Sequence, residues 1–155
     1  MSAITEPAQD ILEQTQQSAH PSCILCGNSQ EGGLGLCFSL SADGGVEAHF
    51  DCPSHWQGYA GILHGGITSA LLDGAMTHCL FARAIIAVTG EMTVRFRHPI
   101  DLHTPLVIQA QIVRSQRPLH LLQARITQDG HVKAKAKGKF MERSAATYRS
   151  RRREK

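Results

Sequence analysis

The chain has 155 residues, of which 42% are hydrophobic, and a net charge of +3 at pH 7. This length and composition are typical of one globular domain with a core of its own. From residue 142 onward there are six basic and two acidic residues, a net charge of +4, which leaves −1 for the preceding 141 residues. The basic charge therefore belongs to a C-terminal tail, so we expect no nucleic acid as a partner.

The N-terminus lacks a basic segment followed by an apolar stretch, and we therefore expect no signal peptide. No apolar run approaches the roughly 18 residues that a membrane-spanning helix needs, so we expect no membrane partner. The five cysteines are an odd number, and without a secretory signal they favour reduced thiols in a cytoplasmic protein.

The first third of the chain is predicted to hold one short helix and two strands. Residues 1–22 are polar and are expected to form an N-terminal arm or a short helix that begins at Thr5 or Pro7. Residues 34–51 are predicted to form two strands, because the Asp-Gly-Gly sequence at 43–45 is a strong hairpin signal.

Residues 64–82 are predicted to form one long helix, since they are rich in Ala, Leu and Met. The apolar residues run almost all the way round this helix and not along one stripe, which indicates that the helix is buried. The strand that follows alternates the apolar Met92, Val94 and Phe96 with polar residues, as a half-buried strand does.

Three further strands are predicted at 105–115, 117–128 and 131–143, with an Asp-Gly turn before the last. We expect the four strands after the helix to form a meander. One long helix with this many strands and no βαβ rhythm predicts an α+β fold, in which an antiparallel sheet wraps the helix. The domain is placed at residues 23–142, and residues 143–155 are expected to be a disordered basic tail.

Asp73 is the single acidic residue between Asp51 and Glu91, and it lies in the middle of the predicted buried helix. Burying a carboxylate costs free energy unless hydrogen bonds satisfy it or its pKa rises. One interpretation is a structural Asp that binds Ser69, Thr77 or the backbone, since both side chains neighbour it on the helical wheel. The other is a catalytic base.

The helix is predicted to begin at His64-Gly65-Gly66, where free N–H groups and the positive end of the helix dipole bind anions. A ligand can approach glycine closely, and an amide at this place can stabilise an oxyanion. A simple tight turn is the alternative. Gly65 and Asp73 are eight residues apart, roughly 12 Å along a helix, so one carbonyl cannot touch both in one chain. A shared site needs two chains, as in a two-fold dimer.

The segments "GYAG" and "HGGITSALLD" resemble the helix signature of hotdog-fold acyl-CoA thioesterases of the phenylacetate-pathway type. "CILCGN" is similar to a subgroup of that superfamily with an N-terminal Cys-x-x-Cys-Gly, and "MTVRFRHPI" is similar to the strand after the helix. The resemblance covers about residues 23–140. It implies a sheet that wraps the helix and a homodimer or homotetramer whose sheets join edge to edge.

The resemblance also implies roles for single residues in hydrolysis of an acyl-CoA substrate without a cofactor. Asp73 matches the general base or nucleophile, and Gly65, within the trio that His64 begins, matches the amide that activates the thioester carbonyl. Thr89 matches the residue that positions water. Relatives often carry Asn where this chain has Gly58, and the adjacent Gln57 is the best substitute.

Substrate contacts are expected at the start of the helix and on the strand after it. Gly66 and Ser69 are assigned to substrate binding next to the amide donor. Arg95 and Arg97 are candidates for coenzyme A phosphates, because guanidinium groups bind phosphoryl oxygens well. An ordinary solvated strand face is the alternative for both arginines.

Three further interpretations concern a different function or a metal site. A hotdog module that binds acyl-thioesters without hydrolysing them is the main alternative, supported by Gly58. A dehydratase is disfavoured, because Asp73 and His78 are five residues apart and lie on different faces of a helix. Cys23-x-x-Cys26 lies near His20, but structural zinc takes four ligands and a second cysteine pair is absent, so we predict no metal.

Overall fold

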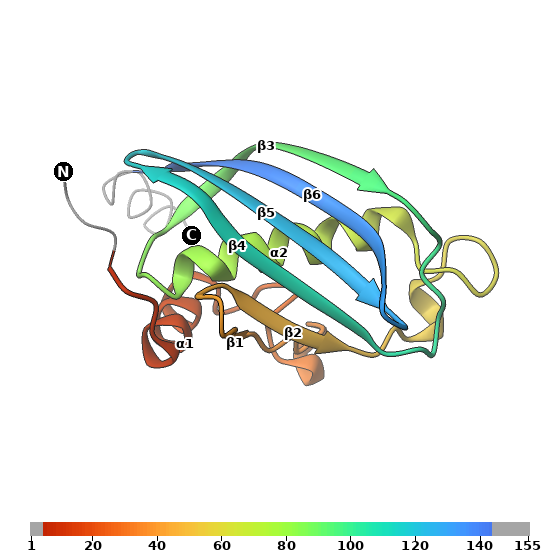
Figure 1. The fold of residues 1–155 in the computed structure, drawn as a ribbon. Coiled ribbons are helices and arrows are strands. Elements are labelled where there is room, and N and C mark those ends of the chain that lie inside the picture. The colour runs from red at the N-terminus through yellow and green to blue at the C-terminus, as the bar shows by residue number, and fades with distance from the viewer. Residues whose placement is uncertain (1–4, 144–155) are drawn as a thin grey trace.

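The computed structural model describes residues 5–143, in which an antiparallel six-stranded sheet wraps around one long helix (Figure 1). The α+β architecture predicted from the sequence is therefore confirmed. No helix in this part of the chain is long and apolar enough to cross a membrane. The elements are α1 (Gln9–Ala19), β1 (Ser39–Leu40), β2 (Val46–Phe50), α2 (Gly65–Phe81), β3 (Ala87–Phe96), β4 (Leu106–Gln116), β5 (Leu119–Gln128) and β6 (His131–Glu142), with short 3₁₀ turns at Ser29–Glu31 and Ser54–Trp56.

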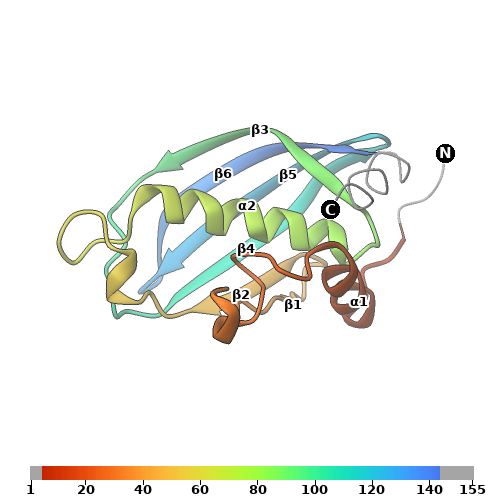
Figure 2. The same cartoon turned by 180° about the vertical axis from the view of Figure 1, so that it is seen from behind.

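Helix α2 is buried on nearly all sides, as its lack of an apolar stripe predicts. Leu71, Leu72, Met76 and Leu80 are each 0% exposed. Burying one such side chain contributes about 1.5–3 kcal/mol before the entropy cost of folding. The inner face of the sheet covers one side of the helix and the N-terminal segment covers another (Figures 1 and 2).

The strand order is β1-β2-β4-β5-β6-β3, which corrects the expected four-strand meander. Of the four strands after α2, only β4, β5 and β6 follow one another as hairpins. Strand β3 pairs with β6, where Thr93 lies opposite Lys137, and so forms the far edge of the sheet. Helix α2 carries the chain across the sheet to the far edge, where β3 begins. Strand β4 therefore pairs with β2 and not with β3. Residue alternation specifies the buried face of a strand but not its neighbours.

The sequence of β6 alternates Ala with Lys, which predicts one buried face and one face in water, and the structure confirms this. Ala134 and Ala136 are 1% and 3% exposed and face α2, whereas the alternating Lys135 and Lys137 are exposed on the outer face. The sheet therefore has one face on the core and one face in water, as antiparallel sheets commonly do.

The N-terminal segment folds over α2. Helix α1 begins at Gln9, later than the expected Thr5 or Pro7, and its Leu12 is 1% exposed within the same core as α2. The Gln9 side chain binds the backbone of Phe38 and Leu40 and so ties α1 to β1. The predicted basic tail, residues 143–155, lies outside the described residues except for Arg143.

Candidate active site

Helix α2 begins with a side-chain cap from His64. The Gly66 N–H donates to Nδ1 of His64 at 2.8 Å, and the Thr68 N–H donates to the His64 carbonyl at 3.0 Å. Capping satisfies N–H groups that have no partner inside the helix. The Gly65 amide has no acceptor within residues 5–143, so it remains available as a donor at the positive end of the helix.

Asp73 lies half-buried two turns further along α2, and its carboxylate binds a residue that is distant in sequence. Oγ of Thr89, on β3, donates to Oδ1 of Asp73 at 2.6 Å. The two neighbours predicted for a structural Asp are engaged elsewhere: Ser69 donates to the Gly65 carbonyl at 3.0 Å, and Thr77 donates to the backbone carbonyl of Asp73 at 3.0 Å. Among the described residues, nothing else donates to this carboxylate.

The contact between Asp73 and Thr89 lies at an irregularity in β3. Thr89 is opposite Phe140 and Glu91 is opposite Lys139, so Gly90 is an extra residue in the strand. Such bulges turn neighbouring side chains and are common beside active sites. The structure thus brings together two of the predicted site residues, through a feature that no sequence motif predicts.

Gln57 does not reach Asp73. Its Oε1 accepts from the Gly61 N–H at 3.1 Å, which closes the loop before α2. A Cβ atom at Gly58 would lie 3.3 Å from both Cα and Cδ2 of His64, so any larger residue there crowds the capping histidine. The packing of the loop against His64 therefore gives a physical reason for glycine at position 58.

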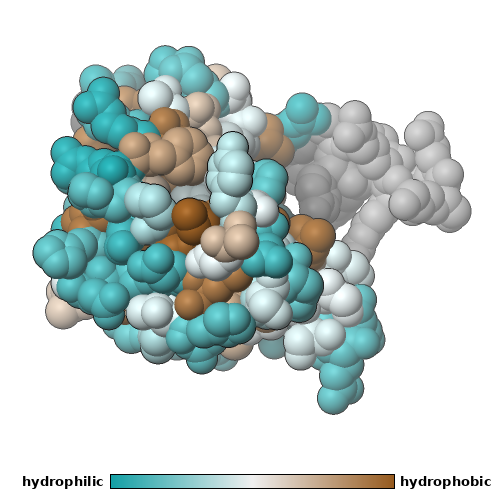
Figure 3. Space-filling model, turned by 90° about the vertical axis from the view of Figure 1, so that its right-hand side faces the viewer, coloured by the Kyte–Doolittle hydropathy of each residue, from teal (hydrophilic) through white to brown (hydrophobic). Residues whose placement is uncertain are grey.

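A hollow opens at the start of α2, and its lining includes residues that the sequence analysis missed. Tyr59 and Phe96, which are 85% and 56% exposed, line it together with Gly65, Arg97 and His98. Figure 3 views this end of the molecule and shows hydrophobic residues gathered near its middle. Two features of the sequence point to them: Tyr59 precedes the glycine motif, and Phe96 is the last residue of β3.

Arg95 does not line this hollow. Its neighbours Met92 and Val94 pack against the core, whereas Arg95 lies opposite Lys135 on the outer face of the sheet. The predicted pair of coenzyme A ligands is therefore separated, and only Arg97 lies beside Gly65.

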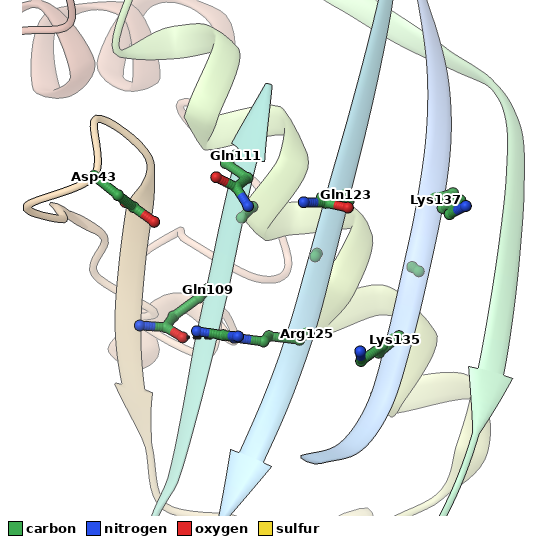
Figure 4. A pocket seen from close by; sticks show the side chains of 10 residues that line it. Asp43, Gln109, Gln111, Gln123, Arg125, Lys135 and Lys137 are labelled. Carbon is green, nitrogen blue, oxygen red and sulfur yellow. Dashed lines mark hydrogen bonds between the residues drawn. The ribbon is translucent and has the colours of Figure 1, made fainter. Parts of the chain in front are cut away.

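A second hollow lies on the outer face of the sheet, away from α2 (Figure 4). Its polar lining comes from the β1–β2 turn and strands β4 to β6: Asp43, Gln109, Gln111, Gln123, Arg125, Lys135 and Lys137. Nε of Arg125 donates to Oε1 of Gln109 at 2.9 Å across this face. The sheet separates these side chains from Asp73, so this hollow is not part of the same site.

Two histidines lie along α2 towards its C-terminal end. Burial lowers the pKa of His78 to about 4, so this residue is neutral at neutral pH, and its ring stacks on Phe38. Burial also lowers the pKa of His20, while the negative charge of Asp73 acts in the opposite direction. Neither ring hydrogen-bonds to Asp73, so the candidate site consists of Asp73, Thr89 and the amide end of the helix.

The sequence was compared with models of known protein families, and one family model matches it. The family model of the thioesterase superfamily matches residues 60–135, which include the His-Gly-Gly start of α2, Asp73 and Thr89. No curated protein matches the chain.

Solved structures share the fold. The E. coli PaaI protein from the phenylacetic acid degradation operon has a TM-score of 0.73 at 16% identity, over 88% of this chain and 96% of that one. A protein from Streptococcus mutans UA159, solved bound to acetyl CoA, has a TM-score of 0.65 at 19% identity, over 70% and 89%.

A thioesterase superfamily protein has a TM-score of 0.69 at 22% identity, over 74% of this chain, and the chain spans 60% of the length of that relative. At these identities the likeness is one of fold, a sheet around a single long helix. The family model's match to residues 60–135 and this shared architecture give the chain the hotdog fold of the thioesterase superfamily.

Proposed function

We propose that this protein is an acyl-CoA thioesterase, which hydrolyses a thioester to the free acid and coenzyme A. The observation that carries the proposal is the 2.6 Å hydrogen bond from Thr89 to Asp73, which orients the one carboxylate of α2 and leaves its Oδ2 without a partner among the described residues. The superfamily match supports thioester chemistry, and the acetyl CoA bound to the S. mutans protein supports the substrate class.

In the proposed reaction Asp73 accepts a proton from water while the water oxygen attacks the carbonyl carbon of the thioester. The Gly65 amide donates to the carbonyl oxygen, where negative charge develops in the transition state. The carbon–sulfur bond then breaks, and coenzyme A leaves as a thiolate that takes up a proton. Direct attack by the Asp73 carboxylate, followed by hydrolysis of the resulting anhydride, gives the same products.

We place the two groups of one site on two chains of a homodimer, or of a tetramer built from such dimers. Gly65 and Asp73 are separated by roughly 12 Å along one helix, so two α2 helices must lie antiparallel for both to meet one thioester. Edge strand β3 supports this arrangement. Its outer edge pairs with no strand in the described chain, and it exposes Val88 and Phe96.

The substrate is proposed to enter at the start of α2. Arg97 and His98 line the hollow there, and Arg97 is suited to a coenzyme A phosphate. Gly66 and Ser69 lie on the first two turns of the same helix, beside the free Gly65 amide, and complete the proposed substrate contacts.

One observation favours the second candidate, a module that binds acyl-thioesters without hydrolysis. Gly58 has no side chain, and the amide oxygen of the adjacent Gln57 is occupied by Gly61. A polar group that relatives often supply beside the thioester is thus missing from this loop. The two candidates differ in turnover and not in binding.

The test is Asp73→Asn, assayed by release of free thiol from a panel of acyl-CoA substrates. The change keeps the volume and an oxygen that can accept from Thr89, so the fold and acyl-CoA binding are expected to persist. Loss of a general base lowers the rate by on the order of 10²–10⁴. Thr89→Ala is expected to give a smaller loss, because Thr89 only orients the carboxylate.

The matched control is Asp129→Asn, in the turn between β5 and β6, where Asn tolerates the positive φ of 51° as well as Asp does. Its turnover should equal that of the parent protein. Parental turnover in Asp73→Asn would contradict the catalytic role, and no turnover in the parent on any substrate would favour the binding module.

A further inference from the structure

Three side chains with metal-binding atoms meet beside α2, at a place that the proposed reaction does not use. A ring nitrogen of His20 and the Sγ atoms of Cys23 and Cys26 all lie within 4.8 Å of one another. Nδ1 of His20 is 3.8 Å from Sγ of Cys26. In a tetrahedral zinc site the ligand atoms lie about 3.5–3.8 Å apart, given Zn–S and Zn–N bonds of about 2.3 and 2.0 Å. Small side-chain adjustments therefore suffice to bind one ion.

The backbone around the cysteines forms a tight turn that holds both thiols. The Leu25 N–H lies 3.4 Å from Sγ of Cys23, and the Gly27 N–H donates to the Cys23 carbonyl at 2.7 Å. A Cβ atom at Gly27 would lie 2.3 Å from that carbonyl oxygen, so only glycine fits. An N–H aimed at sulfur stabilises a metal-bound thiolate, as outer hydrogen bonds do in metal sites generally. The Cys-x-x-Cys-Gly sequence is thus explained by this turn.

A second stretch of chain fixes the turn in place. The Leu34 N–H donates to the Ile24 carbonyl at 2.8 Å, and the Leu36 N–H donates to the Leu25 carbonyl at 3.0 Å. The ligands therefore sit on backbone that is held before any metal arrives, which favours binding because little ordering remains to be done.

The third ligand precedes the motif, and its ring packs against a second, buried histidine. His20 follows α1, and its ring contacts the ring of His78, with centroids 6.3 Å apart. His78 is 1% exposed and its Nδ1 lies 2.7 Å from the Gly74 carbonyl, yet its Nε2 has no partner among the described residues. A buried nitrogen without a partner commonly marks the place of an ion or water.

We propose that His20, Cys23 and Cys26 bind one Zn²⁺ per chain, with the fourth position open to water. Two thiolates and one imidazole select zinc over harder cations. The motif lacks a second cysteine pair and so predicts no metal, but the fold supplies His20 instead. Because Leu25 packs against Gly74, next to Asp73, the metal would fix the N-terminal segment over the helix that carries the candidate base.

The experiment is metal titration of the full chain, purified with a reductant and stripped of metal. Co²⁺ is expected to bind one equivalent per chain with the intense visible bands of tetrahedral thiolate coordination, and Zn²⁺ should displace it and raise the Tm. In Cys23→Ser/Cys26→Ser the affinity should fall by on the order of 100-fold or more. Cys52→Ser, a buried cysteine outside the cluster, is the matched control and should titrate like the parent chain.

The proposal fails if the parent chain shows no saturable cobalt absorption, and this readout stands even if a variant does not fold. It also fails if the double variant binds cobalt as tightly as the parent. None of these measurements depends on thioesterase activity.

Discussion

At the scale of single residues, the two glycines that begin α2 differ in how much room there is for a side chain. A Cβ atom at Gly66 would lie 3.0 Å from Nδ1 of His64, within the cap itself, so a side chain there disturbs the start of the helix. At Gly65 a Cβ atom would meet only the Phe96 ring, at an ordinary 3.6 Å. A small side chain therefore fits at position 65. The group of Gly65 that the proposed mechanism uses is its backbone amide.

This difference permits a substitution that removes only the amide hydrogen. Gly65→Pro deletes the N–H at the first helical position, where proline is well tolerated. His64 already has φ −61° and ψ 134°, a conformation that a following proline allows. We expect the rate of thioester hydrolysis to fall by about 10²–10³, the usual effect of losing one oxyanion donor, with little change in Tm.

Gly65→Ala is the control for that variant, because it adds a Cβ atom but keeps the N–H. Its turnover and its Tm are expected to stay near those of the parent chain, measured on one preparation with the same acyl-CoA. Equal losses in the Ala and Pro variants would show that the site needs space at position 65 and would remove the amide from the mechanism.

At the scale of elements, a polar network joins the end of β6 to the β4–β5 hairpin. Glu142 accepts from Nη2 of Arg117 at 2.8 Å and from Nε2 of His120 at 2.7 Å. His120 is 0% exposed, and its other ring nitrogen binds the hydroxyl of Ser115. The hydrogen bond from Arg117 is the main cause of a lowered pKa at Glu142, with His120 adding to it.

The lowered pKa predicts how stability depends on pH. The fold favours ionised Glu142, so the contribution is present above the ordinary glutamate pKa of about 4.3 and is lost as the pH falls through the lower folded value. Glu142→Gln should cost about 1 kcal/mol near neutral pH, a small value because Arg117 is largely exposed to water. Chemical denaturation at several pH values measures both quantities.

The variant should therefore lose less unfolding free energy than the parent chain when the pH is lowered from neutral to acid. Glu91→Gln is the matched control, since the Glu91–Lys139 pair is exposed on both sides and contributes little. A parallel pH dependence for the parent and Glu142→Gln would show that this carboxylate does not couple to folding.

At the scale of the whole molecule, the proposed site requires two chains, and mixing two inactive variants tests this directly. Asp73→Asn and Gly65→Pro are denatured together and refolded as a mixture. A mixed dimer then has one site with both native groups and one site with neither. Half of the dimers are mixed, so activity should recover to about a quarter of the parental value if the two-fold arrangement is right.

A site formed within one chain predicts no recovery, since every chain in the mixture lacks one group. Sedimentation of the parent protein at the assay concentration provides the second measurement. An active monomer would contradict the two-chain site, whatever the mixture shows.

The sequence by itself determined the local parts of this protein. Apolar residues all round positions 64–82 predicted a buried helix, and the alternation of Ala and Lys in β6 predicted its two faces. The single carboxylate of the helix identified Asp73 as the residue to explain. These features depend on the periods of a helix and a strand, which are properties of neighbouring residues.

Only the tertiary structure decided which of these parts touch. Strand β3 lies beside β6, and its bulge brings Thr89 to Asp73 across 16 residues of chain. Likewise, the turn after α1 places Nδ1 of His20 3.8 Å from Sγ of Cys26. A periodic pattern states which face of an element is buried but not what lies against that face. Which elements contact each other depends on the path of α2 across the sheet and on the packing of the N-terminal segment over α2.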